Sequence, residues 1–181
     1  MQRYTFGPVA SRRFGVSLGI DLSPGAKSCN FDCLYCELPA AVQRNTIEHP
    51  PAVAEIVAEV KAVLATRSDI DVLTITANGE PTLYPDLQPL IDALKTLPDR
   101  PRLLILSNGS TIADPAVQNA LAKLDTVKLS LDCAGAPCFK KLDRQSWNRW
   151  RESTAADGSA GVSGRQLTSP DRGRVWARHW R

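Results

Sequence analysis

The run Ile-Asp-Val-Leu-Thr-Ile-Thr-Ala at residues 70–77 predicts a buried β-strand, because aliphatic and β-branched residues fit the interior of a sheet. Helical patterns lie on both sides of this strand. Apolar residues recur at three- and four-residue spacing over 53–64 and again over 87–94. Strands that alternate with helices along a chain are typical of a parallel sheet with helical crossovers.

The same alternation continues in both directions along the chain. Toward the N-terminus, residues 14–22 predict a strand that ends at the turn signal Ser23-Pro24-Gly25, and a long loop fills residues 26–50. Toward the C-terminus, the pattern predicts a strand at 102–106, a helix around 117–124 and a strand at 127–131. About four β/α units predict an α/β fold, a partial or half TIM-type barrel with parallel strands, since a closed barrel takes eight.

The composition changes abruptly at Arg144, which divides the chain into a patterned part, 1–143, and a tail, 144–181. All four tryptophans and eight arginines lie from Arg144 onward, with Ser and Gly recurring between them. The tail contains too few aliphatic residues to bury a core, and we therefore expect a disordered C-terminal tail. Three explanations stay open: a shift of the reading frame near residue 144, a natural disordered tail, or an Arg/Trp arm that binds RNA.

Overall composition is that of an ordinary globular protein, with 43% hydrophobic residues and a net charge of +3. This mild basicity does not by itself indicate a nucleic-acid partner. The sequence has no apolar run of transmembrane length, and residues 1–9 do not resemble a signal peptide. We therefore expect a cytoplasmic protein without a membrane partner, whose thiols stay reduced.

Three cysteines, Cys29, Cys33 and Cys36, share the loop that follows the first predicted strand, in the spacing Cys-x3-Cys-x2-Cys. Thiolates are the ligands that iron–sulfur clusters prefer. Three of them would leave one iron of a [4Fe–4S] cluster open to a small molecule, as an open position does in catalytic zinc sites. A zinc knuckle is the alternative, but a structural zinc usually takes four protein ligands and the nearby histidine is His49.

This motif, with an aromatic residue before the third cysteine, resembles the radical S-adenosylmethionine (SAM) superfamily. The resemblance implies that the open iron binds the amino and carboxylate groups of SAM. It also implies that the reduced cluster cleaves SAM to methionine and a 5′-deoxyadenosyl radical, which takes hydrogen from a substrate. Tyr35 stands at the aromatic position, where the backbone of the family lies near the adenine.

Two further corners follow predicted strands and resemble family motifs. Ala77-Asn78-Gly79-Glu80-Pro81-Thr82 is similar to the Gly-Gly-Glu-Pro stretch of the family, in which Gly79 and Glu80 would receive the methionine amino group. Ser107 and Asn108 follow the next strand, at a corner that lies close to SAM in the family. Each corner is also an ordinary Asn-Gly turn signal, and for the second corner we leave that alternative open.

The last predicted strand, 127–131, alternates so that Lys128, Ser130 and Asp132 share one face and Val127 and Leu129 share the other. A polar face on a central strand is costly unless it lines a site. Ser130 and Asp132 are therefore candidates for contacts with SAM or substrate at the C-terminal ends of the strands. We expect Cys133 and Cys138 to be incidental thiols, and Arg12-Arg13 to form a solvated basic turn or a phosphate contact.

Residues 7–20 and 29–38 together resemble a subgroup of radical SAM iron–sulfur oxidoreductases related to enzymes that form the wyosine base of tRNA. The resemblance implies an enzyme that uses an electron donor such as flavodoxin or ferredoxin, and an RNA base as one possible substrate. Family members are longer, with further β/α units. A non-catalytic iron–sulfur or zinc-binding protein, inactive because the substrate half is missing, is the alternative.

Overall fold

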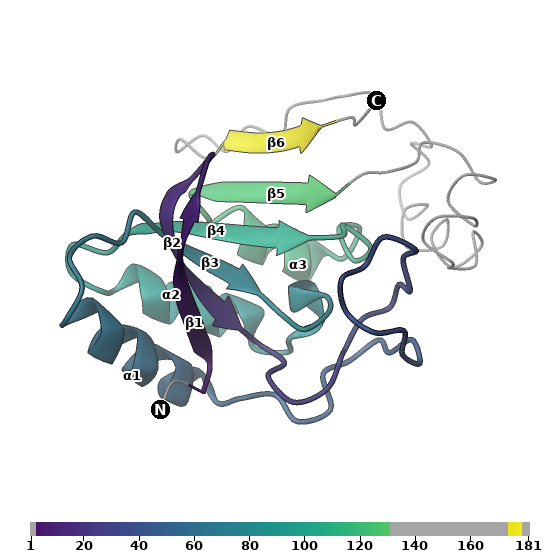
Figure 1. The fold of residues 1–181 in the computed structure, drawn as a ribbon. Helices are drawn as coiled ribbons and strands as arrows, with labels where there is room; N and C mark the ends of the chain where they lie inside the picture. Colours follow the sequence, from purple (N-terminus) through teal and green to yellow (C-terminus); the bar gives the residue numbers. More distant parts are fainter. Residues whose placement is uncertain (1–2, 131–173, 179–181) are drawn as a thin grey trace.

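The computed structural model describes residues 3–130 and 174–178, which form one six-stranded sheet with helices (Figure 1). The strands are β1 (Thr5–Ser11), β2 (Gly15–Asp21), β3 (Val72–Thr76), β4 (Arg102–Ser107), β5 (Thr126–Ser130) and β6 (Arg174–Arg178). The helices are α1 (Val53–Leu64), the short 3-10 helix η1 (Pro81–Leu83), α2 (Leu87–Lys95) and α3 (Pro115–Leu121).

The strands lie in the sheet in the order in which they occur along the chain, from β1 to β6. β1 and β2 pair antiparallel as a hairpin, and every later pair is parallel. In register, Leu18 pairs with Leu73 and Leu73 pairs with Leu103, so that equivalent residues of β2, β3 and β4 lie side by side. The sheet does not close on itself, which confirms the predicted α/β fold with an open, partial TIM-type barrel.

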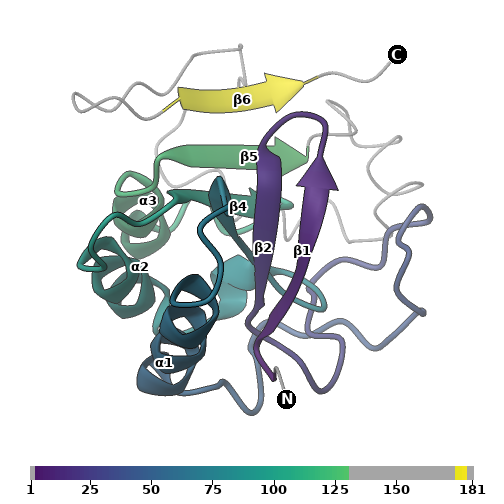
Figure 2. The same cartoon turned by 60° about the vertical axis from the view of Figure 1, so that its left-hand side comes forward.

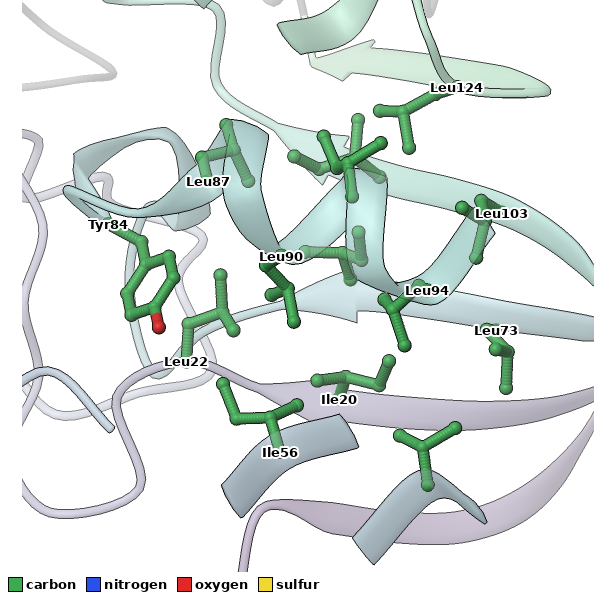
Figure 3. Close-up of a cluster of buried hydrophobic side chains, with 14 of the residues drawn as sticks. Ile20, Leu22, Ile56, Leu73, Tyr84, Leu87, Leu90, Leu94, Leu103 and Leu124 are labelled. Carbon is green, nitrogen blue, oxygen red and sulfur yellow. The ribbon is translucent and has the colours of Figure 1, made fainter. Parts of the chain in front are cut away.

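The three α-helices lie together on one side of the sheet (Figures 1 and 2). They cover a core built from alternate residues of the parallel strands, whose apolar side chains point between α2 and the sheet (Figure 3). Ile20, Leu73 and Leu103 are fully buried in this core, as are Leu90 and Leu94 of α2. The hydrophobic spacing that predicted α1 and α2 is therefore the spacing of the residues they bury.

The intervening residues of the strands form the other face, and several of them are polar. Ser17 of β2 and Thr74 of β3 share a hydrogen bond of 2.7 Å between their hydroxyl groups. On β5, Lys128 Nζ donates to Ser130 Oγ at 3.0 Å, while Val127 packs in the core. The predicted division of the last strand into a polar and an apolar face is thus confirmed for its described residues.

β1 is a strand that the sequence did not predict. It carries Gly7 and Pro8, and its pairing with β2 shifts register between Phe6 and Val9. A register shift interrupts the two-residue alternation by which a strand is recognised, and a proline within a run is usually evidence against a strand. The strands β2 to β5 and the three α-helices lie within a few residues of their predicted positions.

β6 lies in the segment 144–181, for which the sequence predicts no order. Its backbone pairs with β5, whose edge otherwise offers unpaired N–H and C=O groups. At 174–178 the structure therefore differs from that prediction. Residues 131–173, which include Leu131, Asp132, Cys133 and Cys138, and residues 179–181 lie outside the described residues, so the division at residue 144 stays a prediction. Within the described part, none of the helices has the length and apolar character that crossing a membrane requires.

The carboxylate of Glu59 in α1 fastens the start of β1 to the helical layer. It accepts hydrogen bonds from the backbone N–H groups of Arg3, Tyr4 and Thr5, the last at 2.8 Å, and from Thr5 Oγ1 at 2.7 Å. Burial acts to raise the pKa of Glu59, but these donors outweigh it and the pKa lies below its ordinary value of 4.5.

A lowered pKa in the folded state predicts a pH dependence of stability. The contribution of Glu59 is present above the pKa of the unfolded chain and is lost as the pH falls through the lower folded pKa. We expect Glu59→Gln to lower the free energy of unfolding at neutral pH by about 1 kcal/mol, since the site is half-exposed. As the pH is lowered from 5 into the acid range, the free energy of unfolding of the variant should fall less than that of the wild type, as measured by urea denaturation. Glu37→Gln, at an exposed loop position, is the control; equal acid sensitivity of Glu59→Gln and wild type would contradict the assignment.

Candidate functional site

The three cysteines lie in a loop, residues 22–52, that has no helix or strand and joins β2 to α1. In Figure 1 this loop lies beside the C-terminal ends of the parallel strands. Two hydrogen bonds close its base: Arg44 N donates to the carbonyl of Cys29 at 2.8 Å, and Lys27 Nζ donates to the carbonyl of Pro39 at 3.1 Å. We call residues 29–44 the cysteine loop.

A short backbone bridge joins the start of the cysteine loop to the end of β3. Ser28 N donates to the carbonyl of Asn78 at 2.8 Å, and Glu80 N donates to the carbonyl of Ser28 at 2.9 Å. Gly79 lies between them with a φ of +142°, and a Cβ at this position would overlap the carbonyl oxygen of Ser28. The residue must be glycine because the two backbones approach too closely for any side chain.

Glu80 is buried, with 1% of its surface exposed, and its carboxylate accepts four hydrogen bonds. Thr82 donates from its backbone N–H and its hydroxyl, at 3.0 and 2.6 Å. Ser107 Oγ donates at 2.7 Å, and Asn108 N donates at 2.6 Å to the other oxygen. Burial raises the pKa of Glu80, the four donors oppose this, and the net shift is upward. The carboxylate thereby holds the corner after β3 against the corner after β4.

Asn108 connects that second corner to the cysteine loop. Its Nδ2 lies 3.7 Å from Cys29 Sγ and 3.1 Å from Asn30 Oδ1, within hydrogen-bond distance of each. Its Oδ1 accepts from Ser110 N at 2.8 Å, and Ser110 Oγ lies 2.7 Å from Asn30 Nδ2. Asn30 and Ser110 are both buried, so this polar network lies in the interior beside the first cysteine.

The three cysteines supply the type of ligand that iron–sulfur clusters prefer. Cys29, Cys33 and Cys36 are all half-buried and form no disulfide. Burial raises the pKa of the Cys29 thiol, while the Phe31 N–H, 3.4 Å from its sulfur, acts in the opposite direction. Within the described residues, no three Cys, His, Asp or Glu side chains are gathered closely enough to hold a metal ion. The structure therefore places the thiols in one loop without bringing them together.

Four of the other predicted site residues lie together beside Cys29, and the remaining described ones lie elsewhere. Ser107, Asn108, Gly79 and Glu80 meet at one corner beside Cys29, as described above. The Tyr35 side chain is 54% exposed on the cysteine loop. Ser130 is at the C-terminal end of β5, on its polar face with Lys128. Asp132 lies outside the described residues.

Sequence reasoning missed two of the residues that build this site, Asn30 and Ser110. Both are small polar residues in segments without regular structure, and neither periodicity nor turn chemistry marks them. The available signal was position alone: Asn30 follows the first cysteine directly, and Ser110 completes the Asn-Gly-Ser corner after β4.

Gly79→Ala tests the bridge that docks the cysteine loop. The new Cβ would overlap the backbone of Ser28, which no side-chain rotation relieves, and the positive φ adds strain. We expect a loss of at least about 2 kcal/mol in the free energy of unfolding of the chain without cofactor, measured by urea denaturation.

The matched control for this variant is Gly25→Ala. Gly25 lies in the segment 22–52 that contains the cysteine loop, and nothing lies within 4 Å of a Cβ at this position. We expect this variant to change the free energy of unfolding by no more than about 0.5 kcal/mol. Equal effects of the two substitutions would contradict the close approach of Ser28 and Gly79.

Comparisons with known proteins identify the family of the chain. Residues 24–162 match the family model of the Radical SAM superfamily. A UPF0026 protein of Helicobacter pylori (strain J99) is 49% identical over 140 residues, which are 77% of this chain and 46% of that protein. A probable GTP 3′,8-cyclase of Saccharolobus islandicus (strain L.S.2.15) is 33% identical over 114 residues, 63% of this chain and 35% of the cyclase.

The solved structure of TYW1 with a lysine–pyruvate adduct bound has a similar fold. Its TM-score is 0.52 at 18% sequence identity, and the match covers 76% of this chain and 48% of that one. The chain thus spans less than half the length of these similar proteins. The family match covers the cysteine loop, both polar corners and the parallel strands β3 to β5. The chain therefore belongs to the Radical SAM superfamily, and this membership implies a [4Fe–4S] cluster and SAM as its cofactors.

Proposed function

We propose that Cys29, Cys33 and Cys36 hold the [4Fe–4S] cluster and leave one iron open for SAM. We further propose that the chain cleaves SAM reductively to start radical chemistry on a substrate. The observation that carries the proposal is the backbone bridge between Ser28 and Gly79. It sets the first cysteine of the motif against the corner that would receive SAM, at the C-terminal ends of parallel strands, where ligands bind in folds of this class.

The cysteine loop has properties that suit a cluster ligand set. Its base is fixed by the Arg44–Cys29 hydrogen bond and by the bridge to Gly79, while residues 29–44 have no helix or strand of their own. Gathering the three sulfurs around a cluster therefore requires movement within the loop and none in the sheet. When bound, the cluster supplies the electron that cleaves SAM, and the protein supplies position and shelter from water.

The contacts to SAM are proposed at the ends of β3, β4 and β5. Gly79 permits close approach of a ligand to the backbone of its corner, and the buried carboxylate of Glu80 adds negative potential that favours the methionine ammonium group. The four hydrogen bonds to Glu80 come from backbone N–H groups and hydroxyl groups, which are neutral donors, so none of these four partners is a cation. Ser130 would approach SAM or substrate from the end of β5, and the backbone of Tyr35 would lie near the adenine. Asp132 stays a candidate for the same contact on the sequence pattern alone.

The resemblance of residues 7–20 and 29–38 to the wyosine-related subgroup supports an RNA base as a candidate class of substrate. Ferredoxin or flavodoxin is the proposed electron donor, on the same resemblance. Because this chain spans less than half of its relatives, the activity of the whole protein belongs to the proposal as well.

A non-catalytic metal-binding protein is the second candidate. The observation that favours it is the separation of the thiols in this structure, where no three potential ligands are gathered within the described residues. Such a protein would hold an iron–sulfur cluster, or zinc, without cleaving SAM.

Anaerobic reconstitution of the full chain with iron and sulfide separates the two candidates. We expect about four irons per chain, a broad visible absorption band, and 5′-deoxyadenosine when SAM and dithionite are added. Single Cys29→Ala, Cys33→Ala and Cys36→Ala variants should lose both the band and the product. Cys138→Ala, which removes a thiol outside the motif, should retain both.

Three other outcomes of the reconstitution would distinguish the two candidates or contradict the ligand assignment. A cluster that forms without cleaving SAM would support the binding protein. A chain that takes up zinc and no iron would contradict the cluster, and loss of the cluster in Cys138→Ala would contradict the assignment of the three ligands.

A further inference from the structure

We propose that Asn108 is a positioning residue that raises the reduction potential of the cluster through a hydrogen bond from its side-chain amide to Cys29 Sγ. This inference rests on the proposed function and goes beyond it. It also revises the expected role of Asn108, from a contact to SAM to a donor toward a ligand of the cluster.

The orientation of the Asn108 amide is fixed by its partners. Ser110 N is a donor, so the atom that faces it at 2.8 Å must be the carbonyl oxygen Oδ1. The opposite atom, Nδ2, is then the one that faces Cys29 Sγ at 3.7 Å and Asn30 Oδ1 at 3.1 Å. An amide nitrogen carries two hydrogens, one for each of these acceptors, so both of its donor groups are used.

The backbone of Asn108 is held as firmly as its side chain. Its N–H donates to the buried carboxylate of Glu80 at 2.6 Å, and the neighbouring Ser107 Oγ donates to the same group at 2.7 Å. Its acceptor Asn30 is itself buried against Ser110. Hydrogen bonds to Glu80, Asn30 and Ser110 therefore hold Asn108 in place while its Nδ2 faces the sulfur. Residues around metal sites commonly orient the metal ligands in this way.

A donor at this sulfur changes the energetics of reduction. An added electron increases the negative charge on the cluster and its cysteine sulfurs, and a hydrogen bond to sulfur stabilises that charge. The Phe31 N–H, 3.4 Å from Cys29 Sγ, is a second donor to the same atom. Because Cys29 is half-buried, each donor acts in a medium of lower dielectric constant than water, where a hydrogen bond is stronger than at the surface.

The test uses the reconstituted full chain and its Asn108→Asp and Asn108→Ala variants. Asn108→Asp keeps the acceptor for Ser110 N and replaces the donor to sulfur with an anionic oxygen. We expect its cluster to show at least a tenfold lower ratio of reduced to oxidised form at a fixed solution potential, which for one electron is about 59 mV. Asn108→Ala should shift the potential in the same direction by less. The measurement is a redox titration followed by electron paramagnetic resonance.

Thr111→Val is the matched control. Thr111 belongs to the same turn, and its hydroxyl donates to Thr82 Oγ1 at 2.6 Å rather than to the cysteine loop. The cluster of the Thr111→Val variant should have the same reduction potential as the cluster of the wild type. Iron and sulfide content, measured for every variant, separates a changed potential from incomplete loading.

The outcomes separate this inference from the proposed function. A loaded wild type with unchanged potentials in both Asn108 variants would overturn the inference alone, and a wild type that loads no cluster would contradict both. Should neither variant load, pulsed paramagnetic resonance of wild type labelled with ¹⁵N only in the side-chain amide of asparagine decides the matter, because the Asn30 amide nitrogen donates to Ser110 Oγ and not to sulfur. A nitrogen coupling to the reduced cluster supports the bond, and none overturns it.

Discussion

The backbone bridge between Ser28 and Gly79 is the contact on which the rest of the site depends. It consists of two hydrogen bonds, from Ser28 N and from Glu80 N, made possible by the missing side chain of Gly79. This bridge attaches the start of the cysteine loop, which has no helix or strand, to the parallel sheet. The neighbouring strand end is fastened to the same place, since Asp21 Oδ1 accepts from Ser23 N at 2.9 Å and from Asn78 N at 3.0 Å.

The buried carboxylate of Glu80 extends this constraint from β3 to β4. A buried carboxylate is costly unless it is well hydrogen-bonded, and here four donors converge on it. Two of them belong to Ser107 and Asn108, so the charge that stabilises the corner also places Asn108 beside Cys29. One continuous set of bonds thus connects the end of β3, the end of β4 and the first cysteine of the motif.

Much of this arrangement could be predicted from the sequence. The β/α alternation gave the fold because each element buries a regular set of apolar residues, as Ile20, Leu73 and Leu103 do. The cysteine spacing and the Gly79-Glu80 corner identified the superfamily. β1 was missed because a register shift breaks its alternation, and the roles of Asn30 and Asn108 were missed because they depend on contacts between residues about 80 positions apart. No local pattern records such contacts.

We propose that three cysteines of this loop hold a cluster whose open iron binds SAM. Electron–nuclear double resonance on the reduced, reconstituted chain, with SAM carrying ¹⁵N in its amino group, would detect this bond. We predict a nitrogen coupling that shows the amino group bound to iron, absent without SAM and absent in Cys36→Ala. A cluster that forms in the wild type but shows no coupling to the labelled nitrogen would contradict the account.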